Sequence, residues 1–133
     1  GKNAGFSDGD PWINVNPNKE QINVEAEKKD DSSVLNYYRS LISMRKDYEA
    51  LVYGEYEPVL KNDEELFAFR RRGEKETTLT MLNFSDKPKS IPSKINHLEG
   101  KAELLLSNYP AEDNELAGGA VFQPYEARLY LIG

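Results

Sequence analysis

The chain contains no cysteine and only one histidine, one tryptophan and two methionines among its 133 residues. The absence of cysteine excludes disulfides, thiolate metal sites and cysteine nucleophiles, and it fits a reducing compartment. The single histidine, His97, excludes a metal site built on two histidines. No membrane span or signal peptide is evident. We therefore expect a cytoplasmic protein without a cofactor or metal.

Positive charge is also scarce, with 17 basic against 23 acidic residues and a formal net charge of -6. The summed field repels phosphate backbones and anionic lipid, so nucleic acid and membrane partners are not expected. A chain of this length buries roughly two-thirds of its unfolded surface, which allows a sizeable core.

Regular secondary structure is missing from the start of the chain. Gly5, Gly9, Pro11 and Pro17 favour turns over helices or strands. Long loops of this kind are usually disordered or functional, and this one carries too many apolar and aromatic residues for simple disorder. We expect something outside the chain to pack on these residues, which are Phe6, Trp12, Ile13 and Val15.

Residues 30–46 carry the clearest helical pattern, with Asp31 and Ser32 as candidate N-caps. The pattern predicts one buried stripe, formed by Val34, Leu35, Tyr38, Leu41, Ile42 and Arg45.

From Leu51 onward the hydrophobic period changes to two, which is typical of strands. Alternation along the last strand predicts that Tyr125 and Leu129 point into the core. Short sequential strands joined by turns favour an antiparallel sheet or sandwich. The predicted strands are residues 52–60, 65–71, 77–84, 101–107 and 126–132.

Motifs that could carry chemistry are weak. Asp8-Gly9-Asp10 opens like a calcium loop, but Trp12 and Ile13 occupy positions that need an oxygen ligand and a glycine. The run Arg70-Arg71-Arg72 beside Gly73 reads as a solvated hairpin tip. Asn83-Phe84-Ser85 matches a glycosylation sequon, which matters only in a secreted protein. Solvated surface is the expected role of the acidic clusters, which are Asp30-Asp31, Asp63-Glu64-Glu65 and Glu112-Asp113.

Several motifs resemble the α-amylase superfamily, in particular its α-glucosidase and oligo-1,6-glucosidase branch with the sucrose- and trehalose-processing relatives. The motifs occur along essentially the whole chain and in the same order as in the family, although Lys19 stands where that family has an aromatic residue. The motifs are Asn3-Ala4-Gly5-Phe6, Pro11-Trp12, Val15-Asn16-Pro17-Asn18, Ile22-Asn23-Val24-Glu25, Ser33-Val34-Leu35-Asn36-Tyr37-Tyr38-Arg39, Leu41-Ile42-Ser43-Met44-Arg45-Lys46, Leu51-Val52-Tyr53-Gly54, Leu104-Leu105-Leu106-Ser107-Asn108-Tyr109 and Pro124-Tyr125-Glu126-Ala127.

This resemblance implies a mainly β fold. It implies an antiparallel Greek-key β-sandwich in residues 51–133, the C-terminal domain of an α-amylase-type enzyme. Residues 1–50 would be the tail of the catalytic (β/α)8 barrel, namely the loop after its last strand and one amphipathic helix. The catalytic carboxylates would lie upstream of this chain. Because loops after barrel strands line the active-site face, Asn3, Phe6 and Trp12 are candidates for contacting substrate.

Two classes of function stay open. In the first, the chain is the inactive C-terminal part of a retaining glycoside hydrolase that acts on α-glucosidic bonds of short oligosaccharides, and its partner is the missing barrel. In the second, it is an independent carbohydrate-binding or interaction module, since eight tyrosines, five phenylalanines and one tryptophan could present a sugar platform. Most of these aromatic residues fall at alternating strand positions or on the helix stripe, where core packing explains them, and this argues against the second class.

Overall fold

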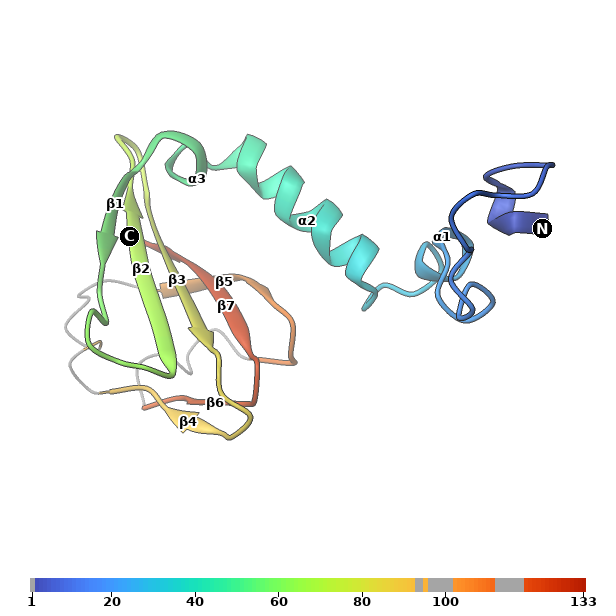
Figure 1. Ribbon diagram of the computed structural model, residues 1–133. Helices are drawn as coiled ribbons and strands as arrows, with labels where there is room; N and C mark the ends of the chain where they lie inside the picture. Colours follow the sequence, from blue (N-terminus) through green and yellow to red (C-terminus); the bar gives the residue numbers. More distant parts are fainter. Residues whose placement is uncertain (1, 93–94, 96–101, 112–118) are drawn as a thin grey trace. The chain divides into compact units, whose positions relative to one another are not determined.

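The computed structural model describes residues 2–92, 95, 102–111 and 119–133, and it divides into two compact units, Gly1–Arg39 and Ser40–Gly133. Helix α2 crosses the boundary between them. None of the helices in the described ranges has the length and apolar character needed to span a bilayer. The helices are the 3-10 helix η1 (Lys2–Gly5) and the α-helices α1 (Val24–Glu27), α2 (Val34–Asp47) and α3 (Ala50–Tyr53), and the strands are β1 (Glu55–Pro58), β2 (Leu66–Arg72), β3 (Thr77–Asn83), β4 (Lys89–Ser90), β5 (Ala102–Ser107), β6 (Val121–Phe122) and β7 (Ala127–Ile132) (Figure 1).

The start of α2 differs from the sequence prediction, because its N-cap is Ser33 and not Asp31 or Ser32. The Ser33 hydroxyl oxygen accepts a hydrogen bond from the Asn36 backbone amide at 3.2 Å, and the hydroxyl donates to the Glu27 carbonyl at 2.7 Å. Ser32 is instead engaged in the preceding turn, where its amide and hydroxyl both donate to Asp30 Oδ1. The predicted helix is present, but it begins after that turn.

The predicted buried stripe of α2 is wrong for this chain, since no residue of the helix is buried. Val34, Tyr38 and Ile42, spaced four residues apart on one face, are all exposed. An amphipathic helix buries its apolar face only where a second element packs against it. The sequence pattern therefore shows which residues share a face of the helix but not what covers that face.

Five of the strands form one antiparallel sheet in the order β1-β2-β3-β7-β5. The C-terminal strand β7 lies between β3 and β5, so the last strand of the chain is interior to the sheet. This architecture of mainly antiparallel sheet with few helices confirms the predicted fold class. The predicted strand at 52–60 is shorter at its start, because residues 50–53 form α3.

Strands β4 and β6 pair in a second sheet, which sequence periodicity missed because each strand has only two residues. In Figure 1 this pair is the one at the bottom of the larger sheet. Side chains on one face of the larger sheet pack with Phe122 of β6 in a single hydrophobic core. The buried members of that core are Leu60, Leu66, Ala68, Leu79, Met81, Ile91, Ile95, Ala120, Phe122 and Tyr130.

The face of β7 that meets this core is the opposite of the predicted one. Glu126 and Arg128 alternate with Leu129 and are both buried on the side of Tyr130. Tyr125 is exposed and has a φ of 58°, so it turns away from the core. Leu129 is buried as expected, but on the other face of the sheet. The pattern failed because a buried ion pair occupies the side that apolar alternation would leave to solvent.

Candidate functional site

Asn3 closes the N-terminal loop. Its side-chain amide donates to the Ser7 carbonyl at 2.9 Å and to the Gly9 carbonyl at 2.7 Å. Asn3 and Ala4 have left-handed backbones with φ values of 52° and 53°. For Ala4 such a conformation costs about 1–2 kcal/mol, so the bonds of Asn3 help to offset local strain.

Phe6 and Trp12, the two aromatic candidates, lie in the open. Their exposed fractions are 89% and 94%, respectively. Both line a groove of about 1250 Å³ within residues 4–25, together with Ile13, Ile22 and Val24. Asn3 is not among its lining residues. The structure thus brings two of the three candidates to one groove, whereas the side chain of Asn3 is bonded within the loop.

These positions limit the chemistry that the loop itself can perform. Both amide hydrogens of Asn3 are used within the loop, so a sugar hydroxyl can interact with this side chain only by donating to Oδ1. Phe6 and Trp12 offer apolar ring faces, which suit either a sugar ring or a protein surface. A contact of these three residues with substrate stays a prediction.

Glu126 is the only buried carboxylate in the described part of the chain, and both of its oxygens are engaged. Oε1 accepts a hydrogen bond from Arg128 Nε at 2.6 Å, and Oε2 accepts one from the Gln123 backbone amide at 2.6 Å. Arg128 also stacks over the Phe122 ring at 4.4 Å. This arrangement is a structural anchor for the corner between β6 and β7.

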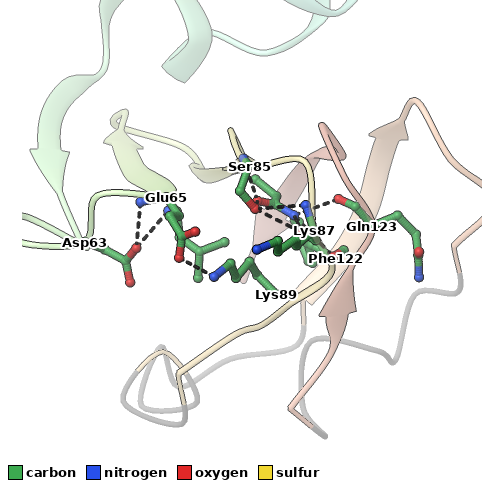
Figure 2. A network of polar contacts seen from close by, with 9 residues as sticks. Asp63, Glu65, Ser85, Lys87, Lys89, Phe122 and Gln123 are labelled. Carbon is green, nitrogen blue, oxygen red and sulfur yellow. Dashed lines mark hydrogen bonds and ion pairs between the residues drawn. The ribbon is translucent and has the colours of Figure 1, made fainter.

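Asn83 is a second anchor that sequence reasoning missed. Its side-chain amide donates to the Lys87 carbonyl at 2.8 Å and to the Gln123 carbonyl at 2.9 Å. Its Oδ1 accepts from both the amide and the hydroxyl of Ser85. Figure 2 shows Ser85, Lys87 and Gln123 converging at this point. Because Asn83 is buried, the sequon is not accessible for glycosylation in the folded chain.

The arginine run is not the solvated tip that the sequence suggested. Arg70 and Arg72 pair with the two oxygens of Glu57 at 2.8 and 3.2 Å. Arg71 donates to the carbonyls of α3, namely Ala50 at 2.9 Å and Val52 at 3.2 Å. The run therefore fastens β1 and α3 to β2.

The acidic clusters at residues 30–31 and 63–65 are exposed, as predicted, and some of their members also stabilise local structure. Asp63 Oδ1 accepts from the amides of Glu65 and Leu66 at the start of β2, and Glu65 pairs with Lys89 (Figure 2). In the described ranges no three His, Asp or Glu side chains are grouped in a way that could hold a metal ion. His97 and the cluster Glu112-Asp113 lie outside the described residues.

The geometry does not identify the protein family, but comparison with known proteins does. Residues 1–54 match the family model described as "Alpha amylase, catalytic domain". The whole chain also aligns with curated relatives of that type. The chain belongs to the α-amylase family. It is 46% identical over 132 residues, 99% of its length, to the "Probable oligo-1,6-glucosidase 2" of Bacillus subtilis. It is 39% identical over 98% of its length to the oligo-1,6-glucosidase of Halalkalibacterium halodurans.

Solved structures of the same family agree. The trehalulose synthase MutB from Pseudomonas mesoacidophila matches 100% of this chain with a TM-score of 0.84 and 34% identity. The trehalose-6-phosphate hydrolase of Bacillus licheniformis also matches 100% of it, with a TM-score of 0.82 and 31% identity. The chain spans only about a quarter of the length of these α-amylase-family proteins: 23% of both curated relatives and 24% of both solved chains.

Proposed function

We propose that this chain is the auxiliary C-terminal part of a longer α-glucosidase-type enzyme, called the longer protein below. Residues 1–50 would form the tail of its catalytic barrel, and residues 51–133 a Greek-key β-sandwich made of the two sheets. The alignment of nearly the whole chain with only 23% of an oligo-1,6-glucosidase carries this proposal. The exposure of Phe6 and Trp12 supports it, because the described part of the chain leaves both aromatic side chains almost fully open to solvent.

The longer protein would hydrolyse α-glucosidic bonds of short oligosaccharides with retention of configuration. Such enzymes place two carboxylic acids about 5 to 5.5 Å apart across the scissile bond, one as nucleophile and one as acid/base. Glu126, the buried carboxylate of the described residues, is held by Arg128 and Gln123 inside the β-sheet unit. The catalytic pair would therefore come from the rest of the longer protein, and the chain alone would be inactive.

Within the longer protein, the loop of residues 3–12 would border the substrate. Phe6 and Trp12 would then present ring faces toward the sugar, and Asn3 would fix the loop that carries them. Both aromatics already line one groove, which supports this assignment.

Hydrolysis of p-nitrophenyl α-glucoside tests the proposal. We expect the longer protein to release p-nitrophenol and the purified chain to release none above background over hours. Turnover by the chain that survives repurification, and that is lost on substitution of one of its own residues, would contradict the auxiliary role.

A carbohydrate-binding module is the second candidate, and one observation now favours it more than the sequence did. Among the described aromatic residues only Phe122 and Tyr130 are buried, so core packing does not account for most of them. Titration of the chain with maltose and isomaltose, followed by NMR shift mapping, separates the two candidates. We expect no saturable shifts, whereas saturable shifts confined to one face of the sheet would favour the module.

A further inference from the structure

The N-terminal loop carries an Asp-Gly pair, Asp8-Gly9, and both residues are exposed. In such a pair the backbone nitrogen of the glycine can attack the side-chain carboxyl group of the aspartate and close a succinimide ring. Glycine has no Cβ to obstruct this approach. Within the described residues no hydrogen bond or ion pair holds the Asp8 carboxyl group, so it can rotate toward the Gly9 nitrogen. How fast the pair reacts then depends on the groups around it.

Lys2 lies against the peptide bond that would react. Its Nζ donates a hydrogen bond to the backbone carbonyl oxygen of Asp8 at 3.1 Å. When the Gly9 nitrogen loses its proton, the negative charge that develops is shared with this oxygen, where the ammonium group of Lys2 stabilises it. Lys2 therefore makes the Gly9 nitrogen a better nucleophile.

Ser7 and Asn3 complete the arrangement. The Gly9 backbone amide donates to Ser7 Oγ at 3.1 Å, so this hydroxyl can take the departing proton while it passes its own proton to water. Asn3 fixes the segment, because its side-chain amide donates to the carbonyls on both sides of Asp8, those of Ser7 and Gly9. A nucleophile, a stabilising charge and a proton acceptor are thus held around one peptide bond.

We propose that Asp8-Gly9 is a modification site at which isoaspartate forms spontaneously, promoted by Lys2. In the first step the Gly9 nitrogen bonds to Asp8 Cγ, and the hydroxyl group of the carboxylic acid leaves with the amide proton as water. Water then adds to one of the two carbonyls of the succinimide and breaks the bond from that carbonyl to the Gly9 nitrogen. Addition at Cγ restores aspartate, and addition at the former backbone carbonyl gives isoaspartate.

The position of Lys2 also favours one product. Its ammonium group polarises the backbone carbonyl of Asp8, which is the group that water must attack to give isoaspartate. That carbonyl becomes the free carboxylate of isoaspartate, beside the Lys2 ammonium group. Both effects raise the share of isoaspartate over aspartate.

The rearrangement would alter the loop that carries Phe6. Isoaspartate adds one carbon atom to the backbone path between the Ser7 and Gly9 carbonyls, which now accept from the same side-chain amide of Asn3. The longer path breaks at least one of these two hydrogen bonds. All residues of this site belong to the chain itself, so the rearrangement does not depend on the rest of the longer protein.

Peptide mapping of the chain after incubation in mildly acidic buffer tests the proposal. Trypsin releases residues 3–19, which contain Asp8, and residues 30–39, which contain the exposed pair Asp31-Ser32 as an internal control. In the Lys2→Met variant the first of these peptides is residues 1–19. Electron-transfer fragmentation distinguishes isoaspartate from aspartate, and the succinimide is lighter by one water.

We expect isoaspartate to accumulate about tenfold faster at Asp8 than at Asp31, because only Asp8 has a following glycine and a lysine on its carbonyl. Gly9→Ala should slow the reaction about fivefold. The added Cβ would lie 3.7 Å from Ser7 Oγ, an ordinary contact, so the loop can keep its structure. Equal rates at Asp8 and Asp31, or an unchanged rate in Gly9→Ala, would overturn the proposed site.

Lys2→Met should slow the reaction roughly two- to fivefold and lower the share of isoaspartate in the product. Lys28→Met removes the same charge from an exposed position outside the loop and should change neither quantity. In urea, where the contact between Lys2 and Asp8 is lost, Lys2→Met should react at the same rate as the unsubstituted chain. Equal effects of the two lysine substitutions, or an effect of Lys2→Met that persists in urea, would overturn the role of Lys2.

Discussion

Asn83 and Arg128 are the residues on which the corner between β3, β6 and β7 depends. Asn83 joins the turn after β3 to the carbonyls at the end of β6, and Arg128 binds Glu126 and lies over the Phe122 ring. Sequence reasoning missed both. An Asn before Phe-Ser looks like a sequon, and a Glu and an Arg two residues apart in a strand look like its solvent face. Only the packed structure reveals that these polar side chains are buried.

Asn83→Ala should lower the free energy of unfolding by about 2–5 kcal/mol, since it removes a buried donor to the Lys87 and Gln123 carbonyls and leaves the Ser85 backbone amide without its acceptor. Urea unfolding followed by circular dichroism measures this loss. Asn62→Ala is the matched control, because Asn62 is exposed in a turn and should change stability by less than about 0.5 kcal/mol. Equal losses in the two variants would refute the anchoring role of Asn83.

Arg128→Met should cost about 3–5 kcal/mol, because it leaves Glu126 as an unpaired buried carboxylate. The double variant with Glu126→Gln should cost less than the sum of the two single changes, because it removes the buried charge as well as its partner. Arg72→Met is the control, since its pair with Glu57 is exposed and should contribute at most about 1 kcal/mol. Additive single effects at the buried pair would contradict this account.

At the scale of elements, hydrophobic periodicity predicted which of the longer segments are helices and which are strands. It failed where contacts with other parts of the chain determine the secondary structure or the buried face. The helix of residues 30–46 and the strands β2, β3, β5 and β7 were all expected. Helix α3 was assigned to a strand because Val52 and Tyr53 are common in strands, although Arg71 and Glu76 hold the segment as a helical turn. The predicted core-facing side of β7 was also wrong, because the side that carries the buried ion pair is the one that faces the core.

The turn that precedes α2 gives a prediction about pH. Bonds from the Ser32 hydroxyl and amide hold the pKa of Asp30 below its usual value of 3.8. Because the pKa is lower in the folded state, this carboxylate stabilises the turn at pH values above its unfolded-state pKa. The contribution is lost as the pH falls through the folded-state pKa.

Ser32→Ala should therefore raise the pKa of Asp30 toward the usual value, as followed by NMR titration of its side-chain carboxyl carbon. Ser43→Ala, on the exposed surface of α2, is the control and should leave the titration of Asp30 unchanged. An unchanged midpoint in Ser32→Ala would show that the hydroxyl bond is not the cause.

At the scale of the whole molecule, the described residues expose large apolar side chains at several sites, among them Tyr53 and Tyr125. Three of these sites are the N-terminal loop, one face of α2, and the face of the larger sheet opposite the core, where Tyr56, Phe67 and Phe84 are exposed. The sequence predicted the first, because its aromatic residues occur in a loop that cannot bury them. It placed the other two inside the fold, since periodicity shows which residues share a face but not what covers that face. The resemblance to the α-amylase family was visible in the motifs. Under our proposal, packing against the rest of a longer enzyme would account for the exposed apolar surface.

Amide hydrogen exchange across residues 6–15 tests most directly the claim that the rest of an enzyme completes this chain. In the chain alone these amides should exchange rapidly, because the loop has few internal hydrogen bonds and its aromatic side chains are exposed. In the longer protein the same amides should be strongly protected, by about tenfold or more. Strong protection already present in the chain alone, or equally rapid exchange in both proteins, would contradict the account.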